Sequence, residues 1–205
     1  EAAGVPALLG NLNMFTDERV FHPFRPEADR RTMDAICSAP LDIAENLHLA
    51  RGIPAVGIVH HRYAGMIDVT AEVRAVLSRA TFLNDAPLRP QGFFYPSDEQ
   101  LAGWICQAAT GLALRETSGS CPVTAQYLLC GTPVVTVANV GGRDHFLRQP
   151  YFTTAATTAE SVAAAVAELA ARSLSRSEIH EATKRMFVAA RARFLEDVNA
   201  ALRAE

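Results

Sequence analysis

The chain has 205 residues, of which 49% are hydrophobic and 20% charged, so it can hold one α/β domain or one domain with a short arm. Its net charge of −3 at pH 7 argues against a nucleic-acid partner or an anionic membrane surface.

Residues 1–31 are mixed in character, and prolines and charges mark their second half as a linker or an arm. From residue 32 onward, short apolar runs alternate with segments of helical spacing. Ser97 followed by Gln100 is a capping box, and Thr157 or Thr158 begins a later helix. We predict strands at 32–39, 53–61, 81–84, 110–116, 132–139 and 151–155, and helices at 40–52, 68–80, 97–109, 121–131, 157–173 and 176–203.

Short, nearly all-apolar strands that alternate with helices indicate a parallel sheet covered on both faces. Right-handed crossovers make this a doubly wound, Rossmann-like α/β fold of about six strands. We therefore divide the chain into an arm at 1–31, a Rossmann-like domain at 32–175 and a packed C-terminal amphipathic helix at 176–205. The sequence has no GxGxxG after the first strand and no GxxxxGK[ST], which weakens the dinucleotide and P-loop alternatives.

Cysteine and histidine spacing predicts neither a disulfide framework nor a metal site. No two cysteines have CxxC spacing, and the six histidines form no HExxH motif. We expect the cysteines to be small buried groups of a reduced, cytoplasmic protein. No apolar run reaches the roughly 18 residues of a membrane span, and no signal peptide is recognisable. The first residue is Glu1, which favours a piece of a longer protein.

Ligands of doubly wound domains bind beyond the carboxyl ends of the strands. One such loop, "RETSGSCPVTAQ" at 115–126, leads into the helix predicted at 121–131. The unpaired first-turn N–H groups of that helix and its dipole favour an anion, so Gly119, Ser120 and Cys121 are candidates to bind a diphosphate or a sugar hydroxyl. Ser118 and Gln126 would face the same ligand. The alternative is a polar turn with a solvated Gln126.

The stretch "SGSCPVTAQYLLCGTPVV" and the following "NVGGRDHF" resemble the nucleotide-sugar-binding half of retaining GT-B glycosyltransferases. The resemblance extends over roughly 15–205 through "FHPF", "DAIC" and the terminal "RMFVAARARF". It implies a C-terminal GT-B domain whose partners are a nucleotide diphosphate sugar and a missing N-terminal domain. It also implies transfer with retention and without a metal or another cofactor. The sugar, the base and the acceptor, whether or not it lies at a membrane, are left unassigned.

Two carboxylates of the family pattern are absent, because the two positions that hold Glu in the family align with Ser118 and Gln126. Gln126 keeps a hydroxyl acceptor without the charge. Glu116, two residues before Ser118, is a candidate replacement. Asn84, at the end of the third strand, would face the base and ribose, or serve only as a turn residue.

The basic pair that neutralises the diphosphate in the family is also absent, since "CSAPLDIAEN" at 37–46 has no basic residue. Arg115, Arg62 or Arg143 could compensate. Arg143 is the preferred contact to sugar or phosphate, and its alternative is a salt bridge to Asp144. The glycine loop around it adds Gly141 and Gly142 to the candidate substrate-binding residues.

Three functions remain open from the sequence. The first is the donor-binding domain of a hexosyl-type retaining glycosyltransferase. The second is a non-catalytic GT-B-like domain that binds a nucleotide, a carbohydrate or a protein partner, which the loss of both charged pairs favours. The third is an unrelated doubly wound domain that binds a small phosphorylated metabolite at the helix start near 121.

Overall fold

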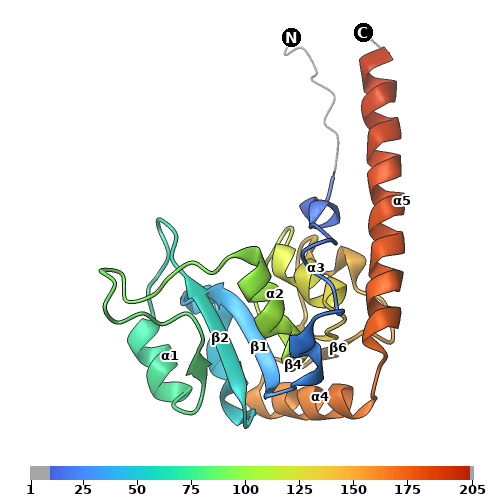
Figure 1. Cartoon of the computed structure of the whole chain (residues 1–205). Helices are drawn as coiled ribbons and strands as arrows, with labels where there is room; N and C mark the ends of the chain where they lie inside the picture. Colours follow the sequence, from blue (N-terminus) through green and yellow to red (C-terminus); the bar gives the residue numbers. More distant parts are fainter. Residues whose placement is uncertain (1–9, 204–205) are drawn as a thin grey trace.

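A six-stranded sheet forms the centre of the computed structural model, which describes residues 10–203 (Figure 1). The strand order is β3-β2-β1-β4-β5-β6, and all neighbouring strands are parallel. The doubly wound Rossmann-like α/β fold predicted from the sequence is confirmed. The strands are β1 Met33–Pro40, β2 Val56–His61, β3 Thr81–Phe82, β4 Ala108–Ala113, β5 Val134–Val137 and β6 Phe152–Ala155.

Five α-helices and several 3₁₀ helices join or flank these strands. The α-helices are α1 Thr70–Val76, α2 Asp98–Cys106, α3 Pro122–Leu129, α4 Ala159–Ala171 and α5 Arg176–Arg203. The 3₁₀ helices among the described residues are η1 Leu12–Phe15, η2 Pro26–Asp29, η3 Ile43–Glu45, η4 Leu47–Gly52 and η5 Arg143–Phe146. None of the helices in the described part of the chain is long and apolar enough to cross a bilayer.

The helix predicted at 40–52 is wrong, because this segment forms the two 3₁₀ helices η3 and η4 instead. Asp42 caps the first of them by accepting a hydrogen bond from the Ala44 N–H at 2.9 Å. Asn46 has a φ of +53° and lies in the left-handed region. A single left-handed residue cannot continue a right-handed helix, so the chain turns at Asn46 and η4 starts afresh.

Both faces of the sheet are buried, as a parallel sheet requires. Ile36 and Val134 contribute to a core with α2, α3, α5 and the arm, whereas the adjacent Ala35 and Val135 contribute to a second core with η4 and α4. Successive side chains of a strand point to opposite faces, which explains this division. Each fully buried aliphatic side chain contributes about 1.5–3 kcal/mol.

Helix starts agree with the sequence signals. Ser97 Oγ accepts from the Gln100 N–H at 3.3 Å and Gln100 Oε1 accepts from the Ser97 N–H at 3.1 Å, so the predicted capping box is confirmed. Of the two candidate caps of α4, Thr158 makes the capping hydrogen bond: its Oγ1 accepts from the Ser161 N–H at 3.2 Å.

The last helix runs along the described part of the arm and then extends beyond the domain (Figure 1). Near its start, Ile179 and Phe187 are fully buried in the core. Farther along, Arg191 forms two hydrogen bonds with Glu18, at 2.8 and 3.0 Å. Helix α5 has 28 residues, which corresponds to about 42 Å at 1.5 Å per residue. The first nine residues of the predicted arm and the last two of the chain lie outside the described residues.

Candidate functional site

The carboxyl ends of β1 and β4 border a pocket of about 480 Å³. These two strands are neighbours in the middle of the sheet. From β1 the chain builds one half of the sheet through β2 and β3, and from β4 it builds the other half through β5 and β6. This is the topological switch point, where doubly wound folds bind their ligands. The polar residues that line the pocket are Ser38, Glu45, His61, Tyr63, Arg115, Ser118, Ser120, Gln126 and Arg143.

The start of helix α3 opens into this pocket, which Cys121, Pro122, Val123 and Gln126 help to line. Cys121 is the N-cap, and its side chain makes no capping hydrogen bond. Pro122 at the first helical position has no N–H group, and its fixed φ suits a helix start. The partial positive charge of the helix start is therefore directed at the pocket, where it favours an anionic group.

The buried Tyr127 fixes α3 against the sheet. Its hydroxyl accepts a hydrogen bond from the Ser38 N–H of β1 at 2.8 Å. Its ring lies over Gly111 of β4, where an added Cβ would come within 2.2 Å of the ring. A glycine at this point of β4 thus allows the helix to approach the switch point closely.

The loop that precedes α3 is supported from behind by the glycine loop. The Ser118 carbonyl accepts from the Arg143 N–H at 3.2 Å and from Asn139 Nδ2 at 3.3 Å. Gly141 has a φ of +137°, and a Cβ there would lie 2.2 Å from the Ser118 oxygen. A Cβ at Gly142 would lie 2.9 Å from the Gly119 oxygen. Gly141 and Gly142 are needed for this packing, and they do not line the pocket.

Gly119 differs from these two glycines. A Cβ built on Gly119 meets no described atom within 4 Å, and the residue is exposed. Its φ does not lie in the left-handed region. Neither packing nor backbone conformation therefore requires glycine here. Gly119 does not itself line the pocket, whereas its neighbours Ser118 and Ser120 do.

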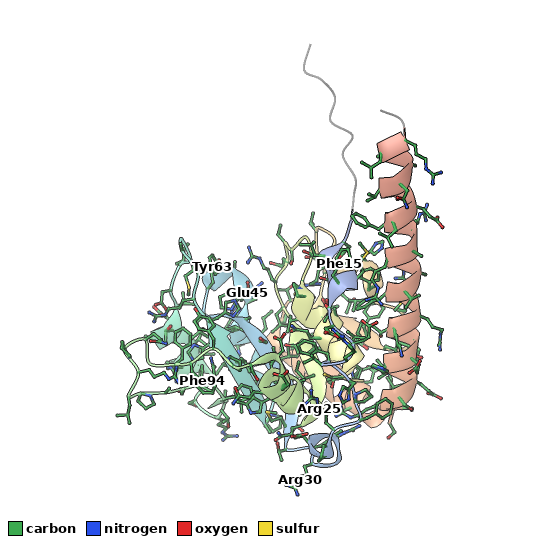
Figure 2. The ribbon with its side chains drawn as sticks, turned by 45° about the horizontal axis from the view of Figure 1, so that its top comes forward. Phe15, Arg25, Arg30, Glu45, Tyr63 and Phe94 are labelled. Carbon is green, nitrogen blue, oxygen red and sulfur yellow. The ribbon has the colours of Figure 1, made fainter. Side chains whose placement is uncertain are left out.

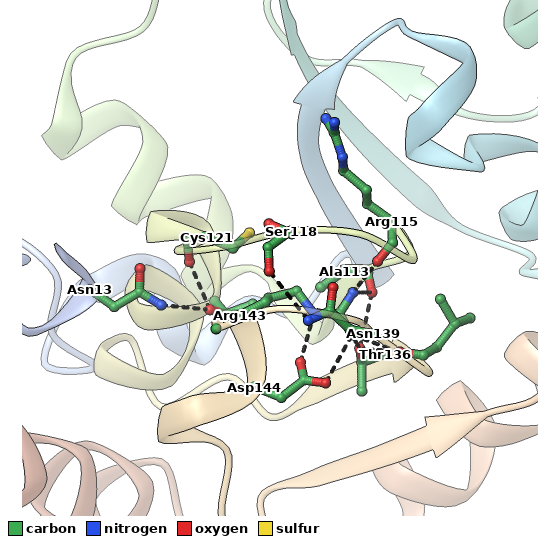
Figure 3. A network of polar contacts seen from close by, with 12 residues as sticks. Asn13, Ala113, Arg115, Ser118, Cys121, Thr136, Asn139, Arg143 and Asp144 are labelled. Atoms are coloured by element: carbon green, nitrogen blue, oxygen red, sulfur yellow. Dashed lines mark hydrogen bonds and ion pairs between the residues drawn. The ribbon is translucent and has the colours of Figure 1, made fainter. Parts of the chain in front are cut away.

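Arg143, the preferred sugar or phosphate contact, has a side chain that is only 1% exposed. Figure 3 shows the protein groups that surround its guanidinium. Its guanidinium donates to the carbonyls of Ala113 at 3.0 Å and Val137 at 2.6 Å, and to Thr136 Oγ1. It also donates to the Arg115 carbonyl at 2.5 Å and forms the salt bridge with Asp144 at 2.6 Å that was the alternative. These acceptors occupy its five N–H donors, so Arg143 fixes the ends of β4 and β5 beneath the pocket.

Asn84 and Glu116 also lie elsewhere than expected. The buried Asn84 accepts from the His60 N–H at 3.0 Å and donates to the carbonyls of His60 and Phe94 at 2.7 and 2.8 Å. Its side-chain bonds are therefore used to hold the turn after β3. Glu116 is exposed and accepts from Thr157 Oγ1 at 3.2 Å, so its carboxylate is directed toward the start of α4. Neither residue lines the pocket.

An ion pair between Glu45 and Arg115 crosses the pocket wall, and sequence reasoning missed its acidic member. Glu45 Oε1 and Arg115 Nη1 are 2.8 Å apart, and the side chains are 13% and 39% exposed. Burial raises the pKa of Glu45 despite the opposing effect of Arg115. The available signal for Glu45 is its place in the first loop after β1, because the loops at the carboxyl ends of the strands surround the ligand site of this fold.

A second polar pair lies beside the first, and Figure 2 places Tyr63 and Glu45 on the same side of the domain. The Tyr63 hydroxyl donates to Asp42 Oδ2 at 2.6 Å. This bond, together with the Ala44 N–H, lowers the pKa of Asp42. Burial lowers the pKa of His61. The pocket wall therefore combines an imidazole whose charged form is disfavoured with the Glu45–Arg115 pair.

Arg62, the other candidate to replace the absent basic pair, forms a salt bridge of 3.0 Å with Asp68 and does not line the pocket. Arg115 is therefore the guanidinium that remains partly accessible at the pocket wall. The site thus combines a helix start, one paired arginine and neutral hydrogen-bonding groups at Ser118, Ser120 and Gln126. Such a set can bind an anion and several hydroxyl groups.

No protein-family model matches the chain. One curated protein, an aminomethyltransferase of Pelodictyon phaeoclathratiforme, is 36% identical over 80 residues, which are 37% of this chain and 21% of that protein. A match to a fifth of a relative carries no argument about this chain's activity.

Solved structures match nearly the whole chain. Anabaena HepE in complex with UDP and glucose matches with a TM-score of 0.66 and 13% identity, over 89% of this chain and 54% of HepE. The C-terminal domain of LpcC, a group 1 glycosyl transferase family protein of Francisella tularensis, matches with a TM-score of 0.61 and 11% identity, over 85% of this chain and 97% of that domain. Sucrose-phosphate synthase of Thermosynechococcus elongatus matches over 50% of its length, with 19% identity and a TM-score of 0.60.

The chain therefore has the fold of the C-terminal domain of GT-B glycosyltransferases, as the resemblance in sequence implied. It spans about half the length of HepE and of sucrose-phosphate synthase.

Proposed function

We propose that this chain is the donor-binding domain of a glycosyltransferase and holds a nucleotide diphosphate sugar in the pocket between β1 and β4. The observation that carries the proposal is the pocket itself, which lies at the switch point and faces the uncapped start of α3. HepE, which has the same fold in half of its length, was solved with UDP and glucose. The fold likeness and the pocket position support the same ligand class.

In this proposal the diphosphate lies at the first turn of α3 and against the backbone of Gly119 and Ser120. The Arg115 guanidinium contributes the positive side-chain charge. Ser118 and Gln126 accept hydrogen bonds from hydroxyl groups of the sugar or the ribose. A second domain, supplied by a longer chain or a partner, brings the acceptor. Transfer retains the anomeric configuration and requires no metal, and the compartment is the cytoplasm.

Donor binding is the first test. Titration calorimetry of the chain with UDP-, GDP- and ADP-sugars should show binding of at least one donor, with EDTA leaving the affinity unchanged. Gly119→Val should weaken that binding, because its side chain would project from the loop between the pocket-lining Ser118 and Ser120. The melting temperature should stay unchanged, because a Cβ at Gly119 meets no described atom within 4 Å. Absence of binding to every donor at millimolar concentration contradicts the proposal.

A non-catalytic role is the second candidate. It is favoured by the pocket's neutral Ser118 and Gln126 and by the pairing of Arg115 with Glu45. This candidate binds a nucleotide, a carbohydrate or a protein partner without turnover, so sugar transfer in the presence of the acceptor-binding half distinguishes the two candidates. If the site is a tuned enzyme, Gln126→Glu should raise donor affinity or turnover. If the double variant Ser118→Ala, Gln126→Ala retains full donor binding, these two positions do not recognise the donor.

A further inference from the structure

We propose that Glu45 sets the donor affinity of this pocket by holding the Arg115 guanidinium, for which the donor diphosphate must compete. The inference rests on the proposed function and names a residue that opposes binding within that site. It makes Glu45 a specificity-determining residue, because it discriminates against ligands that carry more negative charge.

The geometry of the pair carries the inference. Arg115 follows β4 and Glu45 ends η3, so the 2.8 Å contact joins two loops across the mouth of the switch point. Both residues line the same pocket. The carboxylate and the Thr117 carbonyl, at 2.8 Å from Arg115 Nε, take two of the five guanidinium donors. A diphosphate that binds Arg115 bidentately must displace the carboxylate or accept its repulsion.

Among the residues that the structure describes, no other arginine at the pocket is free to replace Arg115. Arg143 lines the pocket but is buried with its donors occupied by the protein. Arg62 is paired with Asp68. The anionic Glu45 therefore opposes the attraction exerted by the start of α3, and the net charge offered to a diphosphate depends on whether Glu45 is ionised.

The surroundings of Glu45 favour loss of its charge. Burial and the nearby Asp42 raise the pKa of Glu45, and Arg115 and Arg143 oppose this rise. The other titratable groups that line the pocket come from the neighbouring elements: Cys37 of β1, His61 at the end of β2, Tyr63 beyond it and Cys121 before α3. Burial keeps both thiols protonated by raising their pKa, and it lowers the pKa of His61.

The consequence is tighter donor binding as the pH falls. The diphosphate of a nucleotide sugar has no proton that titrates near neutral pH, so its charge stays constant. Protonation of Glu45 removes the competitor and releases Arg115 to the ligand. Protonation of His61 at lower pH would act in the same direction, so a variant is needed to isolate the part due to Glu45.

The test is titration calorimetry of the chain and of Glu45→Gln with UDP-glucose, GDP-mannose and ADP-glucose. Near pH 8, far above the ordinary pKa of a carboxyl group, we expect Glu45→Gln to bind about three- to tenfold more tightly than the unmodified chain. This difference should shrink as the pH is lowered, because protonation of Glu45 brings the unmodified chain toward the neutral state of the variant. Glu168→Gln, which removes a 2.7 Å pair with Arg172 on α4, is the matched control and should leave the affinity unchanged.

The outcomes separate the inference from the proposed function. If the unmodified chain binds a donor but Glu45→Gln binds no more tightly and the affinity does not change with pH, the inference is overturned. If neither protein binds any donor, the proposed function fails and the inference with it. If only Glu45→Gln binds, the inference is supported. When Arg115 is already replaced by Gln, adding Glu45→Gln should raise the donor affinity only by the loss of repulsion between the carboxylate and the diphosphate. The guanidinium for which the carboxylate and the donor compete is then absent.

Discussion

Replacement of Arg143 by Met is the sharpest test of the site architecture, because it separates a ligand contact from a structural role. The side chain is 1% exposed and serves three carbonyls, the Thr136 hydroxyl and the Asp144 carboxylate. Met has a similar length but no donor, so these acceptors would lose their partner. Several of them are buried, and each buried acceptor left without a bond costs about 1–3 kcal/mol.

The expected loss for Arg143→Met is about 3–5 kcal/mol in the free energy of unfolding, the range found when one member of a buried polar cluster is removed. For a chain of this length, 1 kcal/mol corresponds to about 2–4 °C, so the melting temperature should fall by about 10 °C. Circular dichroism during heating measures this shift, and urea denaturation measures the free energy.

Arg148→Met is the matched control for this experiment. Arg148 lies on the same loop but is exposed, and its hydrogen bonds go to the nearby carbonyls of His145 and Leu147. Its replacement should change stability by no more than about 0.5 kcal/mol. If Arg143→Met melts like the unmodified chain and loses only donor affinity, the reasoning that Arg143 is a structural residue is refuted.

Three further outcomes follow from the geometry. Gly141→Ala should lower stability by about 2–4 kcal/mol, because its φ is strained for any side chain and its Cβ overlaps the Ser118 carbonyl; Gly119→Ala should leave the urea midpoint unchanged. Asn84→Ala should cost about 2–4 kcal/mol through three lost buried bonds, and an unchanged thermal melt of this variant would contradict its assignment to the turn. The Arg191 hydrogen bond lowers the pKa of Glu18, so the pair stabilises the arm above the carboxyl's unfolded pKa, and this contribution is lost as the pH falls through the lower folded value. Limited proteolysis should cleave the arm of the unmodified chain more slowly than that of Glu18→Gln at neutral pH, and this difference should disappear as the pH falls. Equal cleavage of the two proteins at neutral pH would contradict a stabilising role of the pair.

The sheet was predictable because its signals are local. Strands such as 132–139 are nearly all-apolar runs, and the capping box at Ser97 and Gln100 marks a helix start within a few residues. The segment 40–52 was predicted wrongly, because its apolar spacing is helical while Asn46 adopts a left-handed conformation that spacing does not reveal. Asn is one of the few residues that tolerates this conformation, so the residue type was the available signal.

The candidate site was predictable at its backbone and less so at its side chains. Ser118, Ser120, Cys121 and Gln126 line the pocket at the predicted strand end. The partners of Arg143 come from β4, β5 and η5, and the partner of Arg115 lies 70 residues earlier in the chain. A pairing across such separations depends on which strands become neighbours, and the residues beside each arginine do not contain that information.

The sequence by itself determined the parallel α/β fold, the order of its strands and helices outside the segment 40–52, and the loop that meets the start of α3, because periodicity, caps and turn residues act over a few positions. Only the tertiary structure decided which charges the pocket presents. Packing buried Arg143 beneath the loop and paired Arg115 with Glu45 across the switch point. Charge in a pocket is set by burial and by partners from distant strands, so it emerges only when the sheet has assembled.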